Sequence, residues 1–255
     1  MVDHRRQGAA LSGRPAALVT GAGKRIGAAF ARHLAARGFA VLLHHNASAD
    51  EAGQVAAEIR AAGGTCHLLA ADLADAAAVE TLVGRATALE PGLNLLVNSA
   101  ARFVHDRIEN LTRANWDAHL AVDLSAPAFL SRDFAAHVAA EGGRGLIVNM
   151  VDFKLSGRPD PAFLSYTVAK AGLAALTELL AVALAPAVRV VAIAPGYTLP
   201  GGKQTAEGFE RAFKAAPLGA GSTPDDLCRA LDYAIDSPAV TGTTLLVDGG
   251  MHLLR

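Results

Sequence analysis

The sequence predicts a single α/β domain in which a doubly wound, parallel sheet of about seven strands carries helices on both faces. Three observations lead to this prediction. Short apolar runs alternate along the chain with helix-length segments. The runs are apolar throughout rather than alternating with polar residues, which suits strands that are buried on both faces. The length of 255 residues fits one domain, and no linker or internal repeat divides it.

The candidate strands are seven apolar runs bounded by turn residues or by helical segments. In chain order they are residues 16–20, 40–43, 67–70, 93–98, 145–151, 188–194 and 244–247. Because most of them are separated by a segment long enough for a helix, parallel pairing through right-handed crossovers is expected.

The candidate helices fill most of the intervals between these runs. They are residues 26–37, 50–62, 76–89, 116–141, 166–184 and 224–236. The second of them is followed by Gly63-Gly64, a typical C-terminal stop. We expect residues 1–14 to form a flexible N-terminal tail and residues 15–255 to form the domain.

The composition excludes several classes of protein. The chain has 23 Lys+Arg and 24 Asp+Glu, so its formal net charge is −1 and it lacks the basic surplus of a nucleic-acid or anionic-membrane binder. Mean hydropathy is +0.30. The longest apolar stretch, residues 171–188, is interrupted by Thr177, Glu178 and Pro186, and it is short of the roughly 20 residues that a membrane span needs. The sequence therefore predicts a protein that binds neither nucleic acid nor membrane.

Cysteine usage and the N-terminal residues bear on the compartment. Cys66 and Cys228 are far apart and match no metal-ligand spacing, so we interpret them as buried, reduced side chains. No His, Asp and Glu cluster has metal-site spacing either, and we expect no metal. The N-terminal residues lack the apolar core of a secretory signal, which favours a cytoplasmic location.

A glycine-rich turn joins the first strand to the first helix. It reads Thr20-Gly21-Ala22-Gly23-Lys24-Arg25-Ile26-Gly27. Glycine lets the backbone approach a pyrophosphate, and the helix N-terminus attracts an anion. A tight structural turn is the alternative, but the position after the first strand favours a dinucleotide site. Gly21, Lys24, Arg25 and Ile26 are its candidate contacts.

The end of the second strand distinguishes between the two nicotinamide dinucleotides. A site for the non-phosphorylated form usually places Asp or Glu here, on the ribose hydroxyls. This chain has His44, His45, Asn46 and Ser48 as candidate contacts, with no acid before Asp50. Lys24 and Arg25 could receive a 2′-phosphate, so the sequence favours NADP(H). The alternative for Arg25 is a solvated cation at the helix start.

Further cofactor contacts are expected where later strands end. Asp72-Leu73 follows the third strand; Asp72 is a candidate acceptor for the adenine amino group and equally a candidate helix N-cap. Asn98 and Ala100 close the fourth strand, at the edge where such sheets bind ligands.

Three ionisable side chains are placed to converge at the same edge. Tyr166 and Lys170 are spaced i, i+4 and share one face of a predicted helix. Asp152 directly follows the fifth strand. A YxxxK pair alone is common by chance, whereas its place after this strand indicates a reactive cleft.

Together these motifs resemble the short-chain dehydrogenase/reductase family, whose domain is of the Rossmann type. The TGxxxxxG turn, Asp72-Leu73, Asn98, YxxxK, Pro195-Gly196 and the 241–250 segment occur in the order and spacing of that family. The resemblance covers essentially the whole chain. It adds Pro195 and Gly196 to the expected cofactor contacts.

Within the family, three details are similar to the pteridine reductase and dihydromonapterin reductase branch. Arg25 stands where most relatives carry Gly, and Asp152 stands where most carry a catalytic Ser. Phe103 matches the aromatic residue on which that branch stacks the pterin.

The resemblance implies that NADPH reduces a C=N bond of a dihydropteridine. Tyr166 would transfer the proton, with its pKa lowered by Lys170, which would also hold the nicotinamide ribose. Asp152 would hold or supply a proton on the pterin side, and Arg25 and Phe103 would contact the substrate. Tyr197 lines the pocket or packs beside it. Asp123 replaces the relay asparagine of many relatives, as a fourth catalytic candidate.

The resemblance also implies a homotetramer that forms through the helices 116–141 and 166–184. Two other functions stay open at this point. One is a carbonyl reductase of the same family, acting on a 3-oxoacyl thioester or a sugar, against which Asp152 argues. The other is a catalytically silent NADP-binding sensor, against which Tyr166 and Lys170 argue.

Overall fold

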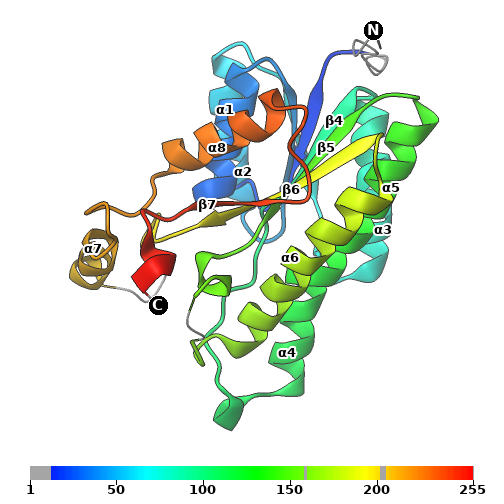
Figure 1. Ribbon diagram of the computed structural model, residues 1–255. Coiled ribbons are helices and arrows are strands. Elements are labelled where there is room, and N and C mark those ends of the chain that lie inside the picture. The colour runs from blue at the N-terminus through cyan, green and yellow to red at the C-terminus, as the bar shows by residue number, and fades with distance from the viewer. Residues whose placement is uncertain (1–12, 158–159, 202–204, 255) are drawn as a thin grey trace, which may run out of the picture.

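A computed structural model describes residues 13–157, 160–201 and 205–254, in which seven strands form one parallel sheet (Figure 1). The spatial order is β3-β2-β1-β4-β5-β6-β7. The strands are β1 Ala16–Val19, β2 Ala40–His45, β3 Cys66–Ala70, β4 Leu93–Asn98, β5 Gly145–Met150, β6 Val188–Pro195 and β7 Thr244–Val247. The predicted doubly wound sheet is confirmed. The strand order reverses between β1 and β4, and such a switch point opens a crevice at the carboxyl ends of the strands.

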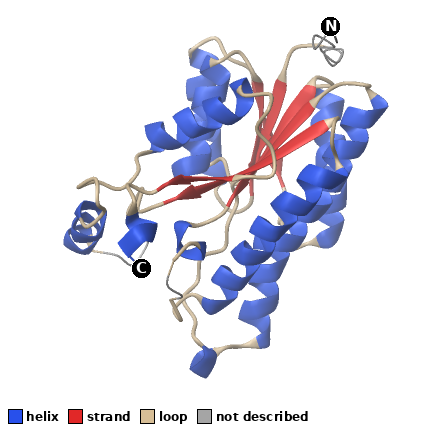
Figure 2. Cartoon of the chain, in the orientation of Figure 1, coloured by secondary structure: helices blue, strands red, loops and turns tan. Residues whose placement is uncertain are grey.

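Helices cover both faces of the sheet (Figure 2). One layer contains α1 Arg25–Ala36, α2 Ala49–Ala61 and α8 Pro224–Asp236. The other contains α3 Ala76–Leu89, α5 Ala126–Ala140 and α6 Leu164–Ala183, and α4 Arg113–Leu120 packs against α6. Each layer has its own apolar core, built around Phe30 and Leu34 on one side and Leu130 and Phe134 on the other.

The central strands are buried along their whole length, which explains their uninterrupted apolar composition. Every residue of β1, β2 and β5 is buried. Strands covered on both faces have no solvent side that would call for alternating polar residues. Burial of each large aliphatic side chain contributes about 1.5–3 kcal/mol, so these strands supply much of the stability of the domain.

Three differences from the sequence-based elements stand out, and the other predicted boundaries agree to within two residues. Strand β2 continues to His45, so His44 and His45 lie inside the sheet. The helix expected over 116–141 begins at Arg113 and contains a π-helical turn, Ala121–Ser125, between α4 and α5. A helix that the apolar pattern did not predict, α7 Ala206–Lys214, begins at the N-cap Thr205 and has no buried residue.

The N-terminal boundary of the domain also moves. Residues 1–12 of the expected tail lie outside the described residues. Arg14, which we expected in the tail, donates hydrogen bonds to Glu90 and to Thr65. Arg14 therefore belongs to the folded domain.

Helix α6 is apolar enough to pass a length-and-composition test for a membrane span. Its apolar character follows from its packing, because Leu173 and Ala181 are buried among residues of the sheet and of α5. Its outer face exposes Leu179 and Val182, and α5 exposes Phe129. Assembly into a homotetramer through these helices stays a prediction.

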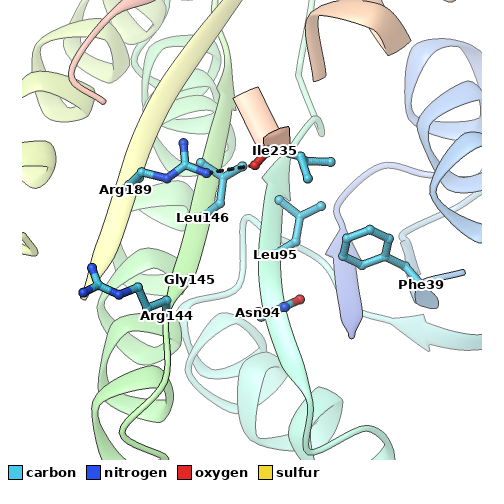
Figure 3. Close-up of a pocket in the computed structure, with 8 residues that line it drawn as sticks. All are labelled: Phe39, Asn94, Leu95, Arg144, Gly145, Leu146, Arg189 and Ile235. Atoms are coloured by element: carbon cyan, nitrogen blue, oxygen red, sulfur yellow. Dashed lines mark hydrogen bonds between the residues drawn. The ribbon is translucent and has the colours of Figure 1, made fainter. Parts of the chain in front are cut away.

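A cavity of about 130 Å³ lies at the amino ends of β4, β5 and β6, the end of the sheet away from the carboxyl ends of the strands (Figure 3). Its lining comes from Phe39, Asn94, Leu95, Arg144, Gly145, Leu146, Arg189 and Ile235. Arg189 donates to the carbonyls of Ala234 and Ile235 at the end of α8. The guanidinium thus satisfies carbonyl groups that a helix C-terminus leaves without partners. We assign it a structural role.

Candidate active site

The glycine-rich turn between β1 and α1 is closely packed and requires glycine. Gly21 has a φ of +65°, and a Cβ there would lie 2.7 Å from Ala100 Cα. A Cβ on Gly27 would lie 2.4 Å from the carbonyl oxygen of Gly21. Lys24, the N-cap of α1, makes no side-chain capping hydrogen bond. The start of α1 therefore keeps donors for an anion, and the turn fits a dinucleotide pyrophosphate.

The two cations of this turn have different partners. Lys24 is exposed and pairs with Glu51 over 2.5 Å. Arg25 has a φ of 55°, a left-handed conformation that favours glycine. Its guanidinium donates to the carbonyl oxygens of Leu199 and Pro200 over 3.2 and 2.6 Å. Arg25 thus connects the cofactor turn to the loop that follows β6, whereas Ile26 packs against the core.

The histidines at the end of β2 support the turn from inside the sheet. His44 Nδ1 accepts the N–H of Gly21, so Nε2 carries the proton and donates to the carbonyl oxygen of Ala71. Burial lowers the pKa of His44 to about 4, and the ring stays neutral. His45 is buried and contacts the Asn46 carbonyl oxygen. His44 therefore stabilises the glycine-rich turn. Contact between His44 and the cofactor stays a prediction.

Four further predicted cofactor residues differ in burial: Asp72 is exposed, Ser48 is partly buried, and Leu73 and Asn98 are buried. Ser48 Oγ lies beside the turn, 2.7 Å from the position of a Cβ on Gly23. Asp72 Oδ1 accepts the N–H of Ala74 in the turn before α3, but the N-cap of α3 is Asp75, so the N-cap alternative for Asp72 is wrong. Leu73 and Asn98 are buried, and Asn98 donates to Asn149.

Backbone contacts position the other two segments of this group. Ala100 donates its N–H to Thr20 Oγ1, which joins the end of β4 to the glycine-rich turn. Gly196, after Pro195, donates to the Val247 carbonyl oxygen, and a Cβ on it would lie 2.7 Å from Asp248 Cα.

The reactive residues come together where β4 and β5 end. The Tyr166 hydroxyl donates to Asp152 Oδ2 over 3.0 Å, and Asp152 Oδ1 accepts the N–H of Lys154. Burial raises the pKa of Asp152, although the Lys154 N–H and ammonium oppose the shift. The sequence placed these residues at one edge; the structure adds a direct hydrogen bond between Tyr166 and Asp152.

The neighbouring lysine lies between two carboxylates and the backbone. Lys170 Nζ is buried, donates to the Met150 carbonyl oxygen over 2.8 Å and lies 3.7 Å from Asp123 Oδ1. Burial lowers the pKa of Lys170, and Asp123 and Asp152 oppose the shift. Burial also raises the pKa of Asp123, to about 6, although Lys170 opposes it. All four predicted catalytic residues therefore belong to one cluster, in which Asp123, Tyr166 and Lys170 are buried and Asp152 is partly buried.

One sequence-based expectation about this cluster is wrong. We expected Lys170 to lower the pKa of Tyr166. The pKa of Tyr166 is instead raised well above its ordinary value, because the phenol is buried and faces the carboxylates of Asp152 and Asp123. Tyr166 is therefore a neutral phenol that holds its proton more firmly than a phenol in water does.

Aromatic rings lie beside this cluster. Phe103 is about half exposed, and its ring meets the edge of the Tyr166 ring at 4.8 Å between centres. Phe163 stacks on Phe103 at 4.2 Å, and Lys154 Nζ lies 4.6 Å from the centre of the Phe163 ring. Tyr197 packs against Phe153, 5.6 Å away.

Sequence reasoning missed Phe163, Lys154 and Asp106. Phe163 precedes Tyr166 by one helical turn, and this spacing was the available signal. Asp106 accepts hydrogen bonds from the N–H and the hydroxyl of Ser165 and from Asn115 Nδ2. It ties the loop that carries Phe103 to the start of α6. Side-chain caps between distant segments have no periodic sequence pattern.

Comparisons with known proteins agree with this geometry. A family model described as enoyl-(acyl carrier protein) reductase matches residues 21–252. A putative ketoacyl reductase of the granaticin polyketide synthase from Streptomyces violaceoruber is 32% identical over 247 residues, which cover 94% of this chain and 97% of that protein.

Two crystal structures of FolM alternative dihydrofolate reductase 1 with NADP are also similar. The protein from Brucella canis is 38% identical at a TM-score of 0.91, covering 96% of each chain. The one from Brucella suis is 39% identical at a TM-score of 0.89, covering 94% of this chain and 95% of that one. With the turn, the Tyr166–Lys170 pair and the sheet order in place, the chain belongs to the short-chain dehydrogenase/reductase family.

Proposed function

We propose that this oxidoreductase reduces a dihydropteridine to the tetrahydro form with NADPH. The observation that carries the proposal is the hydrogen bond from Tyr166 to Asp152, next to the exposed ring of Phe103. A planar heterocycle stacked on Phe103 would meet a phenol that donates a proton and a carboxyl group that binds ring nitrogens. The likeness to the FolM structures, at 38–39% identity, supports the same substrate class.

The chain binds NADP(H), which supplies the hydride when it is bound. The turn at Gly21–Gly27 would hold the pyrophosphate, because its backbone can approach closely and the N-terminus of α1 faces an anion. Lys24, Arg25 and Ser48 lie at this turn and would receive the 2′-phosphate. Lys24 pairs with Glu51, Arg25 donates to the Pro200 carbonyl oxygen, and Ser48 Oγ lies beside Gly23.

The side chains of this chain have distinct tasks in the reduction. Tyr166 donates its hydroxyl proton to the nitrogen of the reduced C=N bond. Asp152 orients the Tyr166 hydroxyl and binds the pteridine ring. Lys170 places a positive charge beneath the phenol and stabilises the phenolate that forms. Phe103 stacks on the substrate, worth about 0.5–1.5 kcal/mol.

The test is a comparison of electron acceptors for the purified enzyme. We expect NADPH absorbance to decline with dihydrobiopterin or dihydromonapterin, and more slowly or not at all with an acetoacetyl thioester. Turnover of the thioester without turnover of either pterin contradicts the proposal. A cytoplasmic location remains part of the proposal and can be checked by cell fractionation.

A carbonyl reductase is the second candidate, because the granaticin relative is named as a ketoacyl reductase. Asp152 distinguishes the two candidates. A carbonyl oxygen that becomes an alkoxide needs a neutral donor beside it, and the carboxylate form of Asp152 would oppose that negative charge. Asp152→Ser should therefore lower pterin turnover and raise thioester turnover if the first proposal holds.

A further inference from the structure

The side chain of Lys154 places a positive charge beside the candidate active site. Lys154 belongs to the short 3-10 turn Phe153–Leu155, which directly follows Asp152 at the end of β5. The backbone N–H of Lys154 donates to Asp152 Oδ1 over 2.8 Å, so the start of the side chain is fixed next to the reactive carboxyl group. Only 11% of the side chain is exposed. The cation is therefore largely removed from water.

Two aromatic rings and one carboxylate surround the ammonium of Lys154. Nζ lies 4.6 Å from the centre of the Phe163 ring and 5.9 Å from the centre of the Phe103 ring. It lies 3.6 Å from Asp160 Oδ2, which is longer than a hydrogen bond. No hydrogen bond joins Nζ to another residue that the structure describes. Aromatic faces attract a cation but do not replace the acceptors that its three N–H donors have in water. The ammonium therefore keeps donors for an acceptor on a ligand.

The same rings connect Lys154 to the proposed position of the substrate. Phe163 stacks on Phe103 with ring centres 4.2 Å apart and 8° between the ring planes, so it covers one face of Phe103. Phe103 is still 51% exposed, which leaves room for a planar substrate on its other face. The ammonium then lies beside a stack of rings that includes the substrate. Opposite charges attract each other over such distances in a partly buried site.

The acidic groups near Lys154 leave its charge only partly balanced. The Asp160 side chain is 32% exposed, so solvent screens its interaction with the ammonium. Burial raises the pKa of Asp152, which lowers the negative charge that this group carries at a given pH. An anionic group that approaches the rings would therefore meet a largely desolvated cation and little opposing charge.

We propose that Lys154 is a specificity-determining residue that favours dihydropteridines with a negatively charged substituent over those with a neutral one. The inference rests on the proposed reduction and specifies the substrate class for it. Phe103 binds the ring system, and the Lys154 ammonium attracts a carboxylate or a phosphate on the substituent. Both anions accept charge-assisted hydrogen bonds from an ammonium, so the test includes one probe of each kind.

The first test compares the binding of three oxidised pterins to the complex of the enzyme with NADP. The probes are pterin-6-carboxylate, the neutral 6-hydroxymethylpterin and the phosphate monoester of this alcohol, and quenching of pterin fluorescence reports each Kd. Wild type should bind both anionic probes about tenfold more tightly than the neutral alcohol. The larger of the two gains identifies the preferred anion. Equal affinities for the three probes overturn the proposal.

Variants of Lys154 assign this preference to the ammonium. Lys154→Met keeps an unbranched apolar stem, and it should bind the anionic probes about tenfold more weakly and the alcohol as wild type does. Lys154→Arg keeps the positive charge and should keep most of the preference. Arg132→Met removes an exposed cation from α5 and should change none of the three affinities. A preference for anions that persists in Lys154→Met overturns the proposal.

The second test is a ratio of turnover rates with the 7,8-dihydro forms of the same three compounds. Loss of Lys154 also alters Asp152, because the ammonium opposes the rise in the pKa of that group, and this effect should change kcat for every substrate alike. The ratio of kcat/KM for an anionic substrate to that for the neutral one removes this shared effect. We expect the ratio to fall about tenfold in Lys154→Met. An unchanged ratio means that Lys154 acts only on Asp152 and contradicts the inference.

The outcomes distinguish this inference from the proposed function. If neutral and anionic pteridines are reduced equally well, the proposed reduction stands and the role of Lys154 in specificity fails. If the anionic probes bind through Lys154 and no dihydropteridine is reduced, recognition of the substituent stands and the proposed reduction fails. If no pterin binds or is reduced, both fail.

Discussion

The Tyr166 hydroxyl donates to Asp152 Oδ2 over 3.0 Å, and this bond makes the phenol and the carboxyl group one titrating unit. Burial raises the pKa of both groups, so each holds its proton more firmly than it would in water. Lys154, on the other side of Asp152, opposes the shift of Asp152. The site therefore favours the protonated forms of both groups.

Tyr166→Phe should lower kcat about 10²- to 10⁴-fold, because it removes the proton donor and leaves the ring in place. The affinity for NADPH, measured by fluorescence titration, should stay near that of wild type. Tyr233→Phe is the matched control, since Tyr233 is exposed on α8. Turnover retained by Tyr166→Phe would mean that another group is the acid.

Asp152→Asn should lower pterin turnover about a hundredfold, because the amide accepts the Tyr166 hydrogen bond but holds no proton. It should also change the stability profile. The folded-state pKa of Asp152 is raised, so its contribution to stability is present at low pH and is lost as pH rises through that pKa. Urea unfolding from pH 4 to pH 8 should therefore show a smaller decline with pH in Asp152→Asn than in wild type. An equal decline in both proteins would contradict this assignment.

Arg25→Ala should weaken NADPH binding, because the guanidinium lies at the start of α1. Arg25→Gly should weaken it equally but should be more stable than the alanine variant by about 1 kcal/mol, since glycine adopts a φ of 55° without strain. Isothermal titration and urea unfolding measure the two effects. Arg113→Ala, which removes an exposed cation on α4, is the control for the loss of one positive charge. An affinity for NADPH that is unchanged in Arg25→Ala would argue against the assignment.

Phe103→Leu should raise the KM for the pteridine about twofold to tenfold, which corresponds to the loss of roughly 0.5–1.5 kcal/mol of stacking. Phe103→Tyr keeps the ring and should keep the KM near that of wild type. The KM for NADPH should change in neither variant. A pteridine KM that is the same in the leucine variant and in wild type would show that the ring does not contact the substrate.

Asp106→Asn should destabilise the protein by about 1–3 kcal/mol at neutral pH, because it weakens three buried hydrogen bonds. Burial acts to raise the pKa of Asp106, but the hydrogen bonds from Ser165 and Asn115 outweigh it and lower the pKa. The stability that this group contributes is present above its unfolded-state pKa and is lost as pH falls. Asp106→Asn should therefore flatten the acid side of the stability profile, and Ser165→Ala, which keeps the carboxylate, should retain part of that slope. A wild-type slope in Asp106→Asn would exclude Asp106 as its source.

Local sequence patterns were sufficient for the sheet and for most of the site. The apolar runs located all seven strands, because strands covered on both faces contain few polar residues. The spacing of Tyr166 and Lys170 and the place of Asp152 after β5 predicted their convergence, since the carboxyl ends of parallel strands share one edge. The π-helical turn at Asp123 and the cap at Asp106 were not predictable, because each depends on a partner far away in the chain.

The sequence by itself determined the strand and helix order and the glycine-rich turn, because these follow from periodicity and short-range spacing, and the roles of the reactive residues were expected from the resemblance to the family. Only the tertiary structure decided the protonation states. His44 is neutral because the sheet encloses it, and Tyr166 has a raised pKa because it is buried and faces the carboxylates of Asp152 and Asp123. The structure also decided the position of Arg25, whose side chain donates to the carbonyl oxygens of Leu199 and Pro200 in the loop after β6. Desolvation and the distances between charges depend on packing between segments, and no local pattern records that packing.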